Sequence, residues 1–244
     1  MSYSQSMRTV HQLVTDRPEA LRRQTAALAG HLGDTDTLRD LLKDPHPSVR
    51  ATVLTALRRC DALHDDVLRA ALADPDPLVR RRAAELAAHH DGVSLTTILR
   101  DRDPLVIEAG AWAAGERPHD RELTEVLARL VELATEHRDP LVREAAVAAI
   151  GSLAAESPAE HELGHADPMA GGRAAVLAAM NDKANIRRRA VLALVAFDGV
   201  DIDAALRAAT EDRDWQVRDA AEELLRIGEA DDPETPDTSA TGPS

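Results

Sequence analysis

Apolar and polar positions follow one another along this chain with the period of an α-helix, and the pattern returns many times. In one copy, apolar residues stand at Val79, Ala83 and Leu86, the spacing of a single helix face. Shorter amphipathic stretches precede such copies, as in residues 66–73 and 173–181. The pattern predicts short helices arranged in pairs.

A short phrase introduces the second helix of each pair: an aspartate-rich turn, often a proline, then an aliphatic residue followed by arginine. Where Asp76 precedes Pro77, we expect the carboxylate to cap the helix and the proline to take its first position. One pair of helices cannot bury its apolar face, whereas stacked pairs share a continuous core. We call the aliphatic residue the anchor, and its copies are Leu21, Val49, Val79, Val106, Val142, Ile186 and Val217.

The composition predicts that the helices pack closely. It also indicates a reducing compartment. The chain is 44% hydrophobic but only 2% aromatic, so Ala, Leu and Val must fill the core. The single cysteine, Cys60, excludes an intramolecular disulfide, and no apolar run is long enough for a membrane span, so we expect a cytoplasmic protein. The net charge of −14 argues against general attraction to nucleic acid or anionic lipid. Small residues four after the anchors should let helices approach closely: Ala83, Gly110, Ala146, Ala190 and Ala221.

The repeated phrase Asp-x-Asp-Pro-x-Val-Arg, with its second helix rich in Ala and Leu, resembles the HEAT repeat in the short form named after phycobilisome lyases. The resemblance covers roughly residues 7–228 and implies an all-α, armadillo-type fold: a right-handed superhelix of about seven helical hairpins. The predicted solenoid domain is therefore residues 1–228, with an insertion at 155–172 between the fifth and sixth repeats. Residues 229–244 are acidic, lack large apolar side chains and are predicted to form a disordered tail.

An arginine follows most anchors, in register with the turn aspartates. Each guanidinium is predicted to bond a turn aspartate of its own or the next repeat and so to join the stack as a structural ladder. The alternative is a basic ladder that binds phosphate or acidic peptides, and the triplets at 80–82 and 187–189 leave nucleic-acid binding open. The ladder arginines are Arg22, Arg50, Arg80, Arg143, Arg187 and Arg218, and the candidate carboxylates are Asp44, Asp74, Asp76, Asp103 and Asp139.

The fourth repeat departs from the pattern. Ile107 stands where arginine is expected, and Gly110 replaces the usual alanine. Trp112 lies six residues after the anchor, a position that is polar in other repeats, so we expect Trp112 to be exposed on the layer of second helices. The polar residues at this position are Thr55, Glu85 and Glu223.

Carboxylates should surround this tryptophan. Glu108 and Glu116 lie four residues before and after Trp112, and Glu85 and Glu144 are expected on the adjacent repeats. Our hypothesis is an acidic patch that receives a basic or amphipathic segment of a protein partner. The alternative is that Trp112 packs into a neighbour and fills room left by the small residue before it.

Residues 161–165 match the His-Glu-x-x-His pattern of zinc peptidases, but Pro158 and Pro168 flank them and the further zinc ligands of those enzymes are missing. A loop metal site at His161, His165 and Asp167 remains an alternative. We assign no catalytic residues and no cofactor. The favoured function is a non-enzymatic scaffold that binds a protein partner on its concave face. Its rival is an accessory subunit or enzyme of the bilin-lyase or hydroxylase kind, because the family that the chain resembles includes both. The hydroxylases carry paired His-Glu dipeptides on several helices, and this sequence has only His161-Glu162, so the resemblance does not extend to their activity.

Overall fold

The computed structural model describes residues 18–156 and 169–230. Every regular element in this part of the chain is a helix, and no strand occurs in it. The all-α class is therefore confirmed. The helices are α2 (Glu19–Leu32), α3 (Thr35–Leu41), α4 (Pro47–Arg59), α5 (Asp65–Leu72), α6 (Pro77–Leu86), the 3-10 helix η1 (Ala87–His89), α7 (Leu95–Ile98), α8 (Pro104–Gly115), α9 (Leu123–Glu136), α10 (Pro140–Ala155), α11 (Ala170–Ala179), α12 (Ala184–Leu194), α13 (Val200–Ala209) and α14 (Trp215–Ala230).

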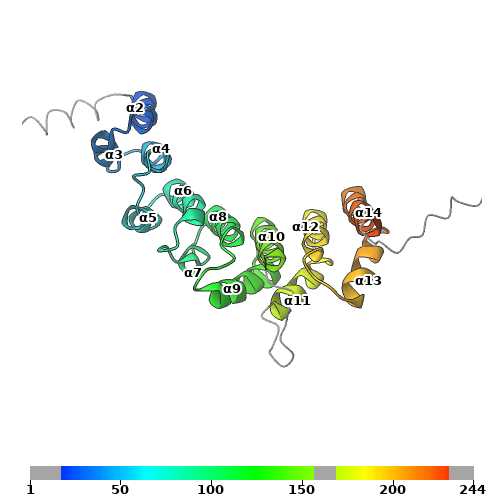
Figure 1. Ribbon diagram of the computed structural model, residues 1–244. Coiled ribbons are helices and arrows are strands. Elements are labelled where there is room, and N and C mark those ends of the chain that lie inside the picture. Colours follow the sequence, from blue (N-terminus) through cyan, green and yellow to red (C-terminus); the bar gives the residue numbers. More distant parts are fainter. Residues whose placement is uncertain (1–17, 157–168, 231–244) are drawn as a thin grey trace, which may run out of the picture. The chain divides into compact units, whose positions relative to one another are not determined.

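The chain divides into two compact units, Met1–Leu130 and Val131–Ser244. In the first unit α2, α4, α6 and α8 pack side by side, and α3, α5 and α7 pack on them (Figure 1). In the second unit α10, α12 and α14 form one layer, which packs on α11 and α13. We call the even-numbered helices, which carry the anchors, B helices, and α3, α5, α7, α9, α11 and α13 A helices. The continuous superhelix over residues 1–228 stays a prediction.

Three B helices begin as the repeated phrase predicts. The side chains of Asp76, Asp103 and Asp139 each accept a hydrogen bond from the backbone amide two residues later, and a proline takes the first helical position. At α14 this position belongs to Trp215, and Asp214 caps the helix. Because the cap sets where each helix starts, the anchor falls at the same helical position in successive repeats.

The core consists of anchors and small residues. Six anchors are buried, whereas Leu21 on α2, the first described helix, is half exposed. The predicted small residues four after the anchors are buried too. Helix approach is close: a Cβ added to Gly30 would lie 2.6 Å from the Cβ of Ala56, and one added to Gly110 would lie 2.6 Å from Cγ2 of Ile98. Aliphatic and alanine side chains thus replace the missing aromatics.

Two predicted boundaries need correction. The insertion at 155–172 ends earlier than predicted, because residues 170–172 form the first turn of α11 and Gly172 is buried there. Residues 229 and 230, which we assigned to the tail, are helical instead, because α14 continues to Ala230. Residues 157–168, which include His161, His165 and Asp167, lie outside the described residues, and so does 231–244. None of the described helices combines the length and apolar character needed to cross a bilayer.

Candidate functional site

The arginine after the anchor cross-links consecutive repeats. In the first unit Arg22 donates two hydrogen bonds to Asp44, from Nε at 2.6 Å and from Nη2 at 3.0 Å. The same paired geometry joins each of these B helices to the turn before the next one. The other rungs are Arg50–Asp74, Arg80–Asp101, Arg143–Asp182 and Arg187–Asp212.

Four of these arginines also reach back to their own turn. Nη1 of Arg50 donates to the carbonyl oxygen of Asp44 at 2.8 Å, six residues earlier. Arg80, Arg143 and Arg187 make the equivalent bond to their own turns. Arg218, in the last described repeat, donates to the carbonyl of Asp212. The guanidinium therefore holds two turns at once, which a lysine could not do with the same planar geometry.

The carboxylates of this ladder differ from three of those we predicted. Asp76, Asp103 and Asp139 do not pair with the ladder arginines in the structure. Their oxygens face the free amides at the start of their own helices. In the turns of Asp76 and Asp103, the partner of the arginine is instead the aspartate two positions earlier. The paired set is Asp44, Asp74, Asp101, Asp182 and Asp212.

The ladder holds its carboxylates in the charged form. Hydrogen bonds from their arginines lower the pKa of Asp182 and Asp212 below the ordinary value. At the other three, burial acts most strongly and would raise the pKa, but hydrogen bonds from the arginine and the turn amide together outweigh it. The pKa therefore lies below the ordinary 3.8 at these residues as well: Asp44, Asp74 and Asp101.

We expect acid to unfold the protein by protonating the ladder. Because these carboxylates bind protons less readily folded than unfolded, their stabilisation is complete above the unfolded pKa of 3.8 and is lost as pH falls through the lower folded values. Thermal melts followed by circular dichroism from about pH 6 down to about pH 2 measure this loss. The variant Arg50→Leu/Asp74→Leu removes one rung and should lose less stability over that range. An equal loss would contradict the prediction.

The B helices present a row of exposed side chains on the face away from the anchors. Trp112 is 49% exposed, as the polar residues at its repeat position predict. Residues seven apart share a helix face, so the leucine just before the anchor lies on the same face. Leu105 precedes Trp112 by seven on α8 and is 44% exposed, and Leu78 on α6 is 48% exposed. Exposed leucines therefore occupy equivalent positions on α6 and α8.

Trp112 borders a depression of about 420 Å³ on α4, α6 and α8. We call it the Trp112 depression. It is not acidic, and our prediction of an acidic patch is corrected here, because arginines from α4 and α6 reach the same place. Its charged and aromatic lining residues are Arg58, Arg81, Arg82, Glu85, His89, Glu108 and Trp112.

Both carboxylates of the depression are engaged by arginine. Glu85 contacts Nε of Arg81 at 3.2 Å with one oxygen and Nη1 of Arg82 at 2.6 Å with the other. Glu108 lies 3.9 Å from Nη2 of Arg81. Within the described residues, no ion pair or hydrogen bond engages the side chain of Arg58, which is exposed. Three guanidinium groups thus face two carboxylates.

The other predicted acidic residues lie elsewhere. Glu116 ends α8 as an exposed C-cap and does not line the depression. Glu144 belongs to the second unit, where it accepts a hydrogen bond from Asn185 and lies 4.0 Å from Arg189. The alternative for Trp112 is corrected as well, since Ile98 of α7 occupies the room beside Gly110.

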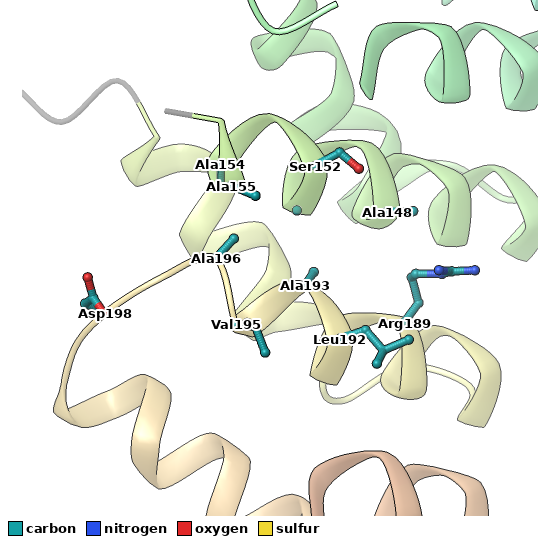
Figure 2. A pocket seen from close by; sticks show the side chains of 11 residues that line it. Ala148, Ser152, Ala154, Ala155, Arg189, Leu192, Ala193, Val195, Ala196 and Asp198 are labelled. Carbon is teal, nitrogen blue, oxygen red and sulfur yellow. The ribbon is translucent and has the colours of Figure 1, made fainter. Parts of the chain in front are cut away.

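The second unit has its own depression, of about 550 Å³, on α10, α12 and the segment that follows α12. Figure 2 shows Arg189 and Asp198 at opposite ends of it, with Leu192 and Val195 between them. The close approach of the two helices forms its floor, because a Cβ on Gly151 would lie 2.7 Å from that of Ala193. This depression is lined mainly by alanine, leucine and valine and suits an apolar side chain.

Comparison with known proteins agrees with this geometry. Residues 7–89 match the family model described as HEAT repeats. The repeats in this part of the chain are therefore similar to HEAT repeats. A crystal structure of an engineered protein superposes with a TM-score of 0.54 at 19% identity, covering 81% of this chain and 97% of that one.

A crystal structure of computationally designed armadillo repeat proteins for modular peptide recognition gives a TM-score of 0.51 at 17% identity, covering 84% of this chain and 98% of that one. Both likenesses show the fold alone. No curated protein matches its sequence.

One buried arginine escaped the sequence analysis. Arg117 follows α8 in the repeat that lacks a ladder arginine, and it donates to the carbonyl oxygens of Val93 at 2.9 Å and Asp91 at 3.3 Å. It also pairs with Asp120, whose side chain is 2% exposed. Arg117 thereby fastens the segment between η1 and α7. The sequence does hold one signal for this role of Arg117, because Ile107 stands where most other repeats have the ladder arginine.

The arginine triplets are divided among different roles. Arg80 and Arg187 belong to the ladder and are buried. Arg81 and Arg82 share Glu85, and Arg188 is exposed. Neither triplet therefore forms a cluster of three free cations of the kind that phosphate binding favours.

A Ser–His–Glu grouping on α2 and α4 has the residue types of a hydrolase but not the arrangement. The hydroxyl of Ser48 donates to Glu19 at 2.5 Å, and His46 contacts Ser48 at 3.1 Å and Glu19 at 3.1 Å. In a hydrolase, the hydroxyl of the activated serine donates its hydrogen bond to a base, which a third group orients. Here the hydroxyl donates its hydrogen bond directly to the carboxylate. The grouping ties two HEAT-repeat helices together. The described residues contain no group of three or more His, Cys, Asp or Glu placed to hold a metal ion.

Proposed function

We propose that this HEAT-repeat chain is a non-enzymatic interaction module whose B helices bind a segment of a protein partner. The observation that carries the proposal is Trp112, half exposed beside a depression, with exposed Leu78 and Leu105 on the same face. Exposed apolar groups gathered in one place mark interaction surfaces, and tryptophan is enriched among the residues that dominate binding.

The division of labour among the arginines supports the proposal. The ladder arginines after the anchors hold the stack together, so the B face keeps its shape without a ligand. A preformed surface does not have to order itself on binding, which favours affinity. The designed armadillo proteins with a similar fold are described as made for modular peptide recognition, which accords with a peptide segment as the ligand.

The short phycobilisome-lyase form of the repeat and a cytoplasmic location remain parts of the proposal. The first depends on the short spacing of the anchors, as between Val79 and Val106. The second depends on Cys60, the one cysteine of the chain, which carries a free thiol. The partner we propose is amphipathic, because an apolar side chain is needed against Trp112.

A peptide selection tests the function. The full chain is immobilised and used to select from an mRNA-displayed library of random 12-residue peptides, and each enriched peptide is measured by fluorescence anisotropy. We expect the Trp112→Ala variant to weaken binding about tenfold or more, because it removes the central apolar contact. The matched control is Arg69→Ala on the exposed side of α5, which should bind like the parent. The absence of any enriched peptide that depends on Trp112 would contradict the proposal.

A further inference from the structure

We propose that the Trp112 depression selects an acidic segment, in which one or more carboxylates bind Arg58 and Arg82 while an adjacent apolar side chain packs on Trp112. This inference rests on the proposed function and adds the chemistry of its partner. It reverses the partner charge expected from the sequence.

The balance of charge inside the depression carries the first step. Its lining holds three arginines and two glutamates, and Arg81 and Arg82 already neutralise Glu85. A lysine or arginine of a ligand would therefore meet no carboxylate that lacks a partner and would approach three guanidinium groups. A ligand carboxylate would instead be attracted by these guanidinium groups.

Two of the arginines have donors to offer. Among the described residues, Arg58 has no hydrogen-bond or ion-pair partner. Arg82 makes one contact to Glu85, through Nη1, and 44% of its side chain is exposed. A guanidinium has five N–H donors in a planar fork that fits a carboxylate with two parallel bonds. A single acidic side chain can therefore be held by either arginine without breaking the pair inside the depression.

The apolar neighbours define the rest of the ligand. Trp112 stands at the edge of the depression, and exposed Leu105 lies two turns before it on the same face of α8. A ligand with only charged side chains would leave this apolar area in water. The segment that fits therefore alternates acidic residues with leucine, valine or an aromatic residue, so that both kinds of contact form together.

The charge of the whole chain sharpens the selection. The net charge is −14, so an acidic segment is repelled by the protein in general and attracted at this basic depression. Nucleic acid suits the surface less well, because a phosphate backbone needs several neighbouring free cations and here Arg81 and Arg82 share Glu85. We therefore assign the depression to a peptide carboxylate.

The test reads the sequences of the peptides that depend on Trp112. Peptides enriched on the parent chain and lost on Trp112→Ala should carry a net negative charge with at least one large apolar residue. The substitution Arg58→Glu should weaken their binding about tenfold or more, and raised salt should weaken it further. The matched control is Arg23→Glu, which places the same charge change at an exposed site on α2 outside the depression.

The outcomes separate this inference from the proposed function. If the peptides that depend on Trp112 are basic, or if Arg58→Glu leaves acidic peptides unaffected, the inference is overturned while the interaction module stands. If no peptide depends on Trp112, both are overturned. Tight binding of a labelled single-stranded DNA 30-mer that is lost in Arg58→Glu and competes with the peptides would assign the depression to nucleic acid instead. Circular dichroism of each variant confirms that the fold is retained.

Discussion

Replacing Asp44 by alanine is expected to lower the free energy of unfolding by about 3–5 kcal/mol. Asp44 is 2% exposed, and its partner Arg22 is buried as well. The substitution removes the carboxylate that accepts two hydrogen bonds from the buried Arg22, and it also removes the acceptor for the backbone amide of His46. Both losses weaken the junction of α2 with α4, so we expect a large loss of stability from this single substitution in a turn.

Urea unfolding followed by circular dichroism measures this loss, and hydrogen exchange of the α2 and α4 amides locates it. The first control is Arg22→Met/Asp44→Leu, which removes both charges and should cost less than the single change. The second is Asp36→Ala, whose carboxylate pairs with Arg39 in full solvent and should change the stability by less than about 1 kcal/mol. If Asp44→Ala were no more destabilising than Asp36→Ala, the ladder would not stabilise the stack.

The repeated phrase was enough to predict the helix pairs because capping, proline position and helical period all act within a few residues. The phrase could not say which acidic residue of each turn meets an arginine. Asp74 and Asp76 are both in the right turn, and only the structure shows that the second is already occupied by the amide of Leu78. Asp74 thus accepts from Arg50 and from the amide of Asp76, whereas Asp76 caps its own helix.

The exposure of Trp112 was predictable from its repeat position, but the charge around it was not. Arg58 comes from α4, which α6 separates from the helix of Trp112, and its place in the same depression depends on how the helices stack. One signal was available: Arg81 and Arg82 precede Glu85 by four and three residues, the spacing at which side chains on a helix pair. Reading that spacing would have shown that Glu85 is neutralised.

The division of the chain into two units has a counterpart in the sequence. The boundary lies between Leu130 and Val131, within the fifth repeat. Just before it, the ladder arginine of the fourth repeat is replaced by Ile107, which is buried, and in the following turn the ladder aspartate is replaced by His137. His137 keeps the local role of that aspartate by accepting the amide hydrogen of Asp139 at 3.1 Å. The absence of both residues that would form a rung is therefore the sequence feature that accompanies this boundary.

Replacing Arg117 by methionine should cost about 3–5 kcal/mol as well, because it leaves the buried carboxylate of Asp120 unpaired and removes the donor to the carbonyls of Asp91 and Val93. Faster hydrogen exchange in α7 and the segment before it would accompany the loss. Arg117→Met/Asp120→Leu should recover part of it, and Arg121→Met, a change at an exposed position nearby, should be close to neutral. Equal stability of Arg117→Met and Arg121→Met would show that the fourth repeat is held by apolar packing alone, without the arginine that replaces its missing rung.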